Sequence, residues 1–488
     1  MFVGIWLGAH DPLDAHAATR PYEGGESPAP RLVESRGSPG SLTAVSPSRR
    51  RSWLERALAG LVLAGLVLAA WRFAQQGYLP QPFYYRVSES LMDLYTPALW
   101  ANHADAYSRW HSLYPPLSFV FLHLTSLNRC YGVNDLAGRN CDWLARLALF
   151  AIFLGNLALV YRNYRLSDPA TAVPRTIAMG LGLPMLYALE RGNLLIPCFT
   201  CFVLGYGDLI RRRWIRCLAL AAAMNFKPYL VFVVVPLIIK RRWAQVAACG
   251  LMGGAIYVAT ALWYGSGWPL QIIANETSYA GAPSKSWFSD LYFATSYWPL
   301  IHVLRAFPPG LRLGSAPVEA VWSAVLTGAL RATQLAALAC LVLALFRPAG
   351  ARVRRLAALS VAVSITAFTT GSAGYAQIFL FFLVFYEPWC GPTRIGVLIA
   401  AYLLCMPIDY VILPVVHQGA FSWLGGRQVT AAAGVSIGQL ARPALLLIIQ
   451  MGLVVLNLED VLRPAEGMRR RHDDGLTCSA PAAGLSGG

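Results

Sequence analysis

The sequence has little charge for its length. Only 13% of its 488 residues are charged, 56% are hydrophobic, and the mean hydropathy is +0.49. A soluble domain carries nearly twice that share of charged residues. Apolar runs long enough to cross a bilayer recur between residues 53 and 457, and a chain crosses a bilayer only as helices or as a closed barrel. The composition therefore predicts an all-α, polytopic integral membrane protein.

Lysine is almost absent. Lys227, Lys240 and Lys285 are the only lysines, so arginine supplies most of the formal net charge of +16. The arginines cluster at the ends of apolar runs, which is the pattern of cytoplasmic loops in membrane proteins. No basic domain lies outside the apolar runs, and we therefore expect no binding of nucleic acid.

Familiar catalytic and metal-binding motifs are missing as well. The chain has no Walker A loop, no HExxH motif and no D-x-D pair, so we expect neither a metal nor a cofactor. Most of the ten cysteines lie inside apolar runs, where cysteine behaves as a small hydrophobe. Cys198 and Cys201 form a CxxC pair, but no basic neighbour is present to lower a thiol pKa. We expect packing roles for the cysteines and no disulfide framework.

Composition divides the chain into three parts. Residues 1–48 are rich in Pro, Gly and Ser and are expected to form a disordered cytoplasmic tail. Residues 49–460 are expected to form the multi-pass domain, and residues 461–488 a basic, disordered cytoplasmic tail. The positive-inside rule then places two loops, at about 75–114 and 265–299, on the outer side of the membrane.

About 10–13 transmembrane or half-membrane helices are expected. The apolar segments are 53–73, 115–128, 143–161, 177–189, 194–210, 214–239, 244–264, 320–346, 356–370, 375–386, 395–413 and 437–456. Several are shorter than the ~20 residues of a full crossing, and Lys227-Pro228 breaks the sixth. If 115–128 crossed fully, strict alternation would put residues 211–213, all arginine, outside. This conflicts with the charge rule, so either 115–128 or a later segment must be re-entrant.

Polar and aromatic residues are densest in the first outer loop, between residues 92 and 117. Asp93 follows the first span by a few residues and could act as a general base, accepting the proton of a sugar hydroxyl that attacks an activated anomeric carbon. It could also cap a helix or remain a solvated loop charge. Asp105 is a rival carboxylate, which we interpret as a solvated helix charge because it lies among small and polar residues.

Three short blocks resemble the glycosyltransferase-C superfamily, and most closely its bacterial polyprenol-phosphate-mannose-dependent α-mannosyltransferases. The first is the pattern D-x-Y-x-x-A…Y…Y-P-P, formed by Asp93, Tyr95, Ala98, Tyr107 and Tyr114-Pro115-Pro116. The second is formed by Glu190-Arg191-Gly192-Asn193, Lys227-Pro228-Tyr229 and Lys240-Arg241-Arg242-Trp243, with its G-Q-x-N-like part shifted. The third is Ser372-Ala373-Gly374-Tyr375-Ala376. Together they cover roughly residues 62–385.

The resemblance implies glycosyltransferase-C architecture and transfer of a hexose, mannose by preference, from a polyprenyl-phosphate donor. The acceptor would be a lipid or glycan in the outer leaflet or periplasm of a bacterial inner membrane, and the anomeric carbon would be inverted. Carried over by position, Asp93 would be the catalytic base. Tyr95, Tyr107 and Tyr114 would contact the acceptor or shape the loop.

A lipid-phosphate leaving group requires cations or hydrogen-bond donors near its developing charge. The candidates are Arg191, Asn193, Lys227 and His302. Each has a plainer alternative, namely an ion pair with Glu190, a helix cap, snorkelling to the interface, and a structural helix start, in that order. The aromatic residues of 277–302 could line a sugar site or form an interfacial belt, and Lys285 and Asp290 are interpreted as loop charges.

Other classes of membrane protein remain open from the sequence alone. A flippase or transporter of a lipid-linked sugar would also use lone charges and aromatic cavities, but it predicts internal repeats and charges near the middle of spans. A polysaccharide ligase or polymerase predicts a large outer loop with several Arg and His, whereas residues 265–299 contain no Arg.

Overall fold

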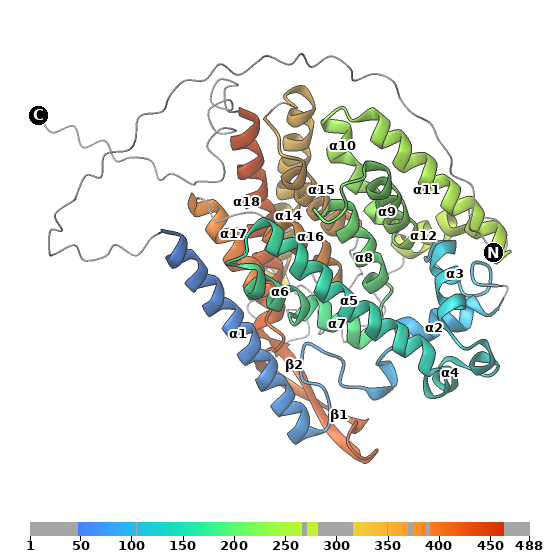
Figure 1. Cartoon of the computed structure of the whole chain (residues 1–488). Coiled ribbons are helices and arrows are strands. Elements are labelled where there is room, and N and C mark those ends of the chain that lie inside the picture. The colour runs from blue at the N-terminus through green and yellow to red at the C-terminus, as the bar shows by residue number, and fades with distance from the viewer. Residues whose placement is uncertain are drawn as a thin grey trace, which may run out of the picture. The chain divides into compact units, whose positions relative to one another are not determined.

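The computed structural model describes residues 47–103, 105–265, 271–281, 316–348, 350–368, 374–386 and 391–462. Its helices are α1 (Pro47–Gln76), α2 (Met92–Ala101), α3 (Pro116–Thr125), α4 (Asp135–Cys141), α5 (Trp143–Ser167), α6 (Ala172–Gly180), α7 (Leu183–Arg191), α8 (Leu195–Tyr206), α9 (Arg213–Phe226), α10 (Val235–Ile239), α11 (Trp243–Tyr264), α12 (Gln271–Gly281), α14 (Ala316–Phe346), α15 (Val353–Phe368), α16 (Gln377–Phe385), α17 (Gly391–Leu404) and α18 (Ile437–Leu462) (Figure 1). Short 3-10 turns are η1 (Val87–Glu89), η2 (Asn128–Tyr131), η3 (Pro228–Val234) and η5 (Gly374–Ala376). The strands are β1 (Val411–Phe421) and β2 (Gln428–Ser436).

Six helical segments in the described part are long and apolar enough to cross a membrane. They are Trp53–Gln76, Trp143–Ser167, Ala172–Arg191, Trp243–Tyr264, Gly328–Phe346 and Ile437–Leu462. This confirms the predicted class of a mainly helical, multi-pass membrane protein. The predicted tails and most of the loop at 265–299 lie outside the described residues, and they stay predictions.

Several other apolar helices are short. α3 has 10 residues and α8 has 12, which corresponds to about 15 and 18 Å against a hydrocarbon thickness of about 30 Å. The segment predicted at 115–128 is therefore too short to cross fully. A half-crossing α3 would keep the arginines at 211–213 on the cytoplasmic side, as the charge rule requires. The break at Lys227-Pro228 is confirmed, because α9 ends at Phe226 and η3 begins at Pro228.

A β-hairpin is the main departure from the sequence prediction. The sequence predicts a span at 395–413 and a connection from there to the next span at 437–456. Instead α17 ends at Leu404, and β1 and β2 pair antiparallel, with Ala420 opposite Val429. The start of β1, VILPVV, is rich in β-branched residues, which favour strands. The turn contains Gly425 and Gly426 at φ +83° and +66°, conformations that glycine adopts without strain.

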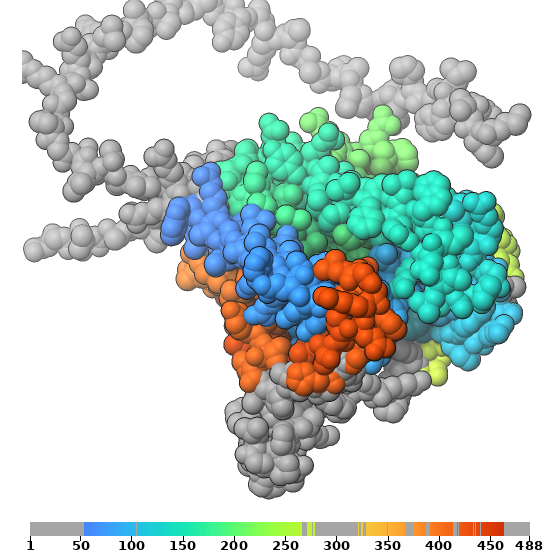
Figure 2. Space-filling view, turned by 90° about the horizontal axis from the view of Figure 1, so that it is seen from below, coloured from blue at the N-terminus to red at the C-terminus, as the bar shows by residue number. Residues whose placement is uncertain are grey.

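The hairpin supports the segment that follows α1. Trp423 N donates to the carbonyl of Gly77 (2.8 Å), and the Gln81 side chain donates to and accepts from the backbone of Gly434 (2.8 and 3.1 Å). Figure 2 shows the orange-red hairpin lying against the blue segment around the end of α1. The hairpin thus holds residues 77–85, which lead directly into the first outer loop.

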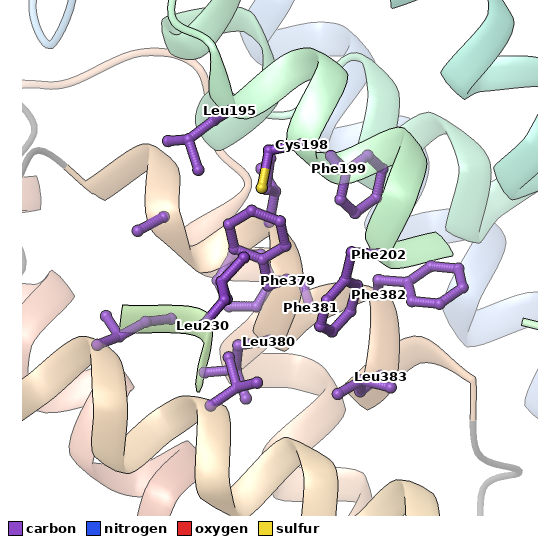
Figure 3. Packing of buried hydrophobic residues seen from close by; sticks show 14 of the residues in the cluster. Leu195, Cys198, Phe199, Phe202, Leu230, Phe379, Leu380, Phe381, Phe382 and Leu383 are labelled. Atoms are coloured by element: carbon purple, nitrogen blue, oxygen red, sulfur yellow. The ribbon is translucent and has the colours of Figure 1, made fainter. Parts of the chain in front are cut away.

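The core between α8, α16 and η3 is aromatic. Phe199 and Phe202 of α8 pack against Phe379 and Phe382 of α16, with ring centroids 5.0–6.2 Å apart (Figure 3). Cys198 is fully buried beside them, and its thiol donates to the carbonyl of Ala223 (3.5 Å). The packing role predicted for Cys198 is confirmed.

One disulfide escaped the sequence analysis. Cys130 of η2 and Cys141 of α4 are bonded, with Cα atoms 5.6 Å apart. The sequence contained a signal for this pair, because both residues lie outside the long apolar runs and only 11 positions separate them. The bond closes the loop that carries α4, which packs against α2.

Removing this disulfide is expected to lower the free energy of unfolding by about 2–3 kcal/mol, because a closed loop of this length restricts the unfolded chain by about that amount. The variant is Cys130→Ser with Cys141→Ser, measured by thermal unfolding in detergent. Reductant should lower the wild-type midpoint and leave the double variant unchanged. Cys201→Ser, at a free half-buried cysteine, is the matched control. Labelling of both thiols in denatured, unreduced wild type would contradict the bond.

Candidate functional site

Asp93 lies in the first turn of α2 and contacts the turn between α7 and α8. Arg191 Nη2 lies 2.8 Å from Asp93 Oδ1, and Asn193 Nδ2 donates to Asp93 Oδ2 at 2.8 Å. The partners are 98 and 100 residues away in the chain. Both carboxylate oxygens face these side chains, so Asp93 does not cap its own helix. The prediction that these three residues share a site agrees with this geometry.

Gly192 allows this close approach. It ends α7 in the left-handed region (φ +70°), and a Cβ there would lie 2.9 Å from Leu94 Cβ and 3.1 Å from Leu91 Cα. Glycine alone avoids both the steric cost of this conformation and the clash. Leu91 N also donates to the carbonyl of Glu190 (2.8 Å). The start of α2 is therefore fixed against the end of α7.

Arg191 is held on several sides. Besides Asp93, its Nη1 donates to the carbonyl of Glu89 (2.6 Å), and its guanidinium lies 4.5 Å from the centroid of the Tyr84 ring. The Glu190 carboxylate instead accepts from Ser90 Oγ (2.7 Å). Among the described ion pairs Arg191 contacts Asp93 and Glu89 directly, while Glu190 interacts with Arg191 only at longer range. The Arg191 side chain is 12% exposed and that of Asp93 is 21% exposed, so the carboxylate is the more accessible partner.

Asn193 contacts both the start of α8 and Asp93. Its Oδ1 accepts from Leu195 N (3.0 Å), at the first residue of α8, while its Nδ2 donates to Asp93. The side chain is nearly fully buried. It therefore orients the carboxylate through a rigid helix start.

Lys227 lies at the end of α9, beside the tyrosines of neighbouring segments. Its Nζ lies 4.3 Å from the centroid of the Tyr114 ring. The Tyr375 hydroxyl, at η5, interacts electrostatically with Asp93, Arg191, Tyr114 and Tyr229. Two carboxylates lie against Arg191, because Glu89 Oε2 is 3.6 Å from Arg191 Nη1. Tyr375 connects this group with Tyr114, the ring beside Lys227.

Tyr84, Tyr187 and Tyr375 form an aromatic wall that the sequence analysis did not single out as site residues. Tyr187 lies between the other two, with ring centroids 6.2 Å from Tyr84 and 5.8 Å from Tyr375 and near-parallel planes. Burial raises the pKa of Tyr84, and the nearby Arg191 charge opposes that rise. The available signals were the run Phe83-Tyr84-Tyr85 in the first loop and the small-residue entry around Tyr375.

The other predicted tyrosines shape the loop. Tyr95 donates to the carbonyl of Asp142 (2.9 Å), and Tyr107 donates to the carbonyl of Tyr114 (2.9 Å). Burial raises the pKa of both hydroxyls. Asp105 is exposed, which agrees with its interpretation as a solvated charge. His302, Lys285 and Asp290 lie outside the described residues.

No three His, Cys, Asp or Glu side chains within the described residues are grouped so that they could hold a metal ion. No protein-family model, curated protein or solved structure matches this chain. Function is therefore argued from the chemistry of the site. A carboxylate held by Arg191 and Asn193 is fixed in orientation, and a second cation nearby suits an anionic ligand.

Proposed function

We propose that the protein is a membrane glycosyltransferase that moves a hexose, mannose by preference, from a polyprenyl-phosphate donor to a lipid or glycan acceptor. The observation that carries this proposal is the contact of Asp93 with Arg191 and Asn193, in one cluster with Lys227. A base and two cations are the groups that an inverting transfer from a lipid phosphate requires. The resemblance of the three sequence blocks to glycosyltransferase-C enzymes supports the same reaction.

In this reaction the acceptor hydroxyl oxygen attacks the anomeric carbon of the donor. The bond from that carbon to the phosphate oxygen breaks, and its electron pair remains on the phosphate. Asp93 takes the proton that the acceptor oxygen loses. Arg191 and Lys227 stabilise the negative charge that develops on the leaving phosphate, and Asn193 keeps the carboxylate oriented.

The site is assigned to the outer face of a bacterial inner membrane. Basic segments meet on the opposite face: Lys240 Nζ donates to the carbonyl of Pro348 (2.5 Å), and Arg355 Nη1 lies 2.8 Å from Asp460 Oδ2. The positive-inside rule makes that face cytoplasmic. The disulfide lies in the loop beside α2, and disulfides persist in oxidising compartments, which supports the assignment independently.

The direct test is sugar transfer by the purified protein in nanodiscs, with radiolabelled polyprenyl-phosphate-mannose as donor and a membrane lipid extract as acceptor. We expect a labelled product that forms with time and enzyme concentration. Polyprenyl-phosphate-glucose in a parallel reaction measures the preference for mannose. Movement of the labelled donor between leaflets without any product would instead favour the flippase.

A further inference from the structure

Two tyrosine hydroxyls in the site have no hydrogen-bond partner among the described residues. Tyr375 and Tyr229 are half-buried, and neither hydroxyl makes a hydrogen bond within the described part of the chain. Buried tyrosine hydroxyls usually have a hydrogen-bond partner. By contrast, Tyr164 donates to the carbonyl of Phe382 (3.2 Å) and Tyr206 to that of Val233. Neither hydroxyl is among the buried polar atoms that lack a partner, so both are open to solvent and to a ligand.

The Tyr375 ring and the Tyr229 backbone are each fixed by a contact with a neighbouring element. Tyr375 stacks on Tyr187, with centroids 5.8 Å apart and planes at 27°. Tyr229 belongs to η3, and its carbonyl accepts from Ser364 Oγ of α15 (2.6 Å). Tyr229 is the second residue of η3, after Pro228, and Tyr375 is the second residue of η5, after Gly374. Both hydroxyls therefore extend from short 3-10 turns.

The surroundings of the two hydroxyls define the ligand's charge. Tyr375 interacts electrostatically with Arg191, Asp93 and Tyr229, and Tyr229 interacts with Tyr114. The Lys227 ammonium in turn lies over the ring of Tyr114. The hydroxyls thus belong to a part of the site that also contains Arg191, paired with Asp93 and Glu89, and Lys227, which lies two residues before Tyr229. A ligand with several acceptor oxygens and a negative charge fits this setting.

We propose that Tyr375 and Tyr229 donate hydrogen bonds to the phosphate of the lipid-linked sugar, between Arg191 and Lys227. This inference rests on the proposed function and names two further residues that bind the donor. The phosphate is present both in the donor and in the polyprenyl phosphate that remains after transfer. The contribution of the tyrosines is therefore measurable with polyprenyl phosphate alone.

The experiment measures binding of tritiated polyprenyl phosphate to protein in nanodiscs, without sugar or acceptor. Tyr375→Phe and Tyr229→Phe should each raise Kd by about tenfold or more, which is the expected effect of losing a hydrogen bond to a charged group. The thermal midpoint of the ligand-free protein should stay the same or rise, since neither hydroxyl has a partner to lose in the described part of the chain. Tyr164→Phe is the matched control, and it should lower the midpoint without changing Kd.

Competition identifies the source of the phosphate. Unlabelled polyprenyl phosphate should displace the label, whereas polyprenol and inorganic phosphate should do so poorly. Wild-type affinity in both variants would overturn the inference and leave the assignment of Asp93, which rests on turnover, intact. If the variants weakened binding of polyprenol as much as binding of polyprenyl phosphate, the hydroxyls would contact the lipid chain and not the phosphate, and the inference would also be overturned. Absence of wild-type binding would overturn both this inference and the proposed donor.

Discussion

Replacing Asp93 with asparagine is expected to lower the rate of sugar transfer by about 10²–10⁴-fold, the usual effect of removing a general base. Asparagine matches aspartate in size, but its amide cannot take the proton from the acceptor. The loss should appear in kcat. The KM for the donor should change little or fall, because Arg191 would no longer share its charge with a carboxylate and would remain available to the phosphate.

A purely structural role of Asp93 predicts a different pattern. The contact with Arg191 and Asn193 joins α2 to the turn before α8, so its loss would lower the thermal midpoint and raise the donor KM together. Rates must therefore be compared at equal folded yield. Asp105→Asn is the control, since Asp105 is an exposed carboxylate in the same loop. Full activity in Asp93→Asn with loss in Asp105→Asn would move the base to Asp105.

The site could be predicted from sequence where charged residues interrupt apolar runs. An ionisable residue at the edge of a membrane span is costly unless it has a partner or a function, and this reasoning selected Asp93, Arg191 and Lys227. It did not reveal which residues pair, because a contact between residues 98 positions apart depends on tertiary packing. Tyr84, Tyr187 and Tyr375 were not predicted as site residues, because aromatic residues near a membrane interface are common whatever the function.

The fold was predictable in class and less so in its details. Hydropathy found the long spans, and proline marked the break before η3. The hairpin was missed because residues 411–416, at the start of β1, read equally as the end of a helical span, and a short apolar run does not distinguish strand from helix. The disulfide was missed because most cysteines in this chain lie in apolar runs, and the same packing role was assumed for Cys130 and Cys141, which lie outside them.

Breaking the ion pair between Glu55 and Arg175 is expected to lower the free energy of unfolding by about 3–5 kcal/mol. Both side chains are fully buried, and Arg175 donates from Nε and Nη2 to the two Glu55 oxygens at 2.8–3.3 Å. Tyr402 of α17 also donates to Glu55 (2.9 Å), so the pair joins α1, α6 and α17.

Glu55→Gln should therefore lower the thermal midpoint strongly, because it leaves the Arg175 charge buried without a counter-charge. The double variant Glu55→Met with Arg175→Leu should recover much of that loss, since an apolar pair of similar volume carries no desolvation cost. The measurement is a double-mutant cycle of thermal unfolding in nanodiscs, with Glu55→Met and Arg175→Leu as the two single variants. Additive losses in the cycle would contradict the coupling. Glu55 lies at the start of the first span, between Arg51 and Arg56, where an acidic residue marks a specific contact that the positive-inside rule does not explain.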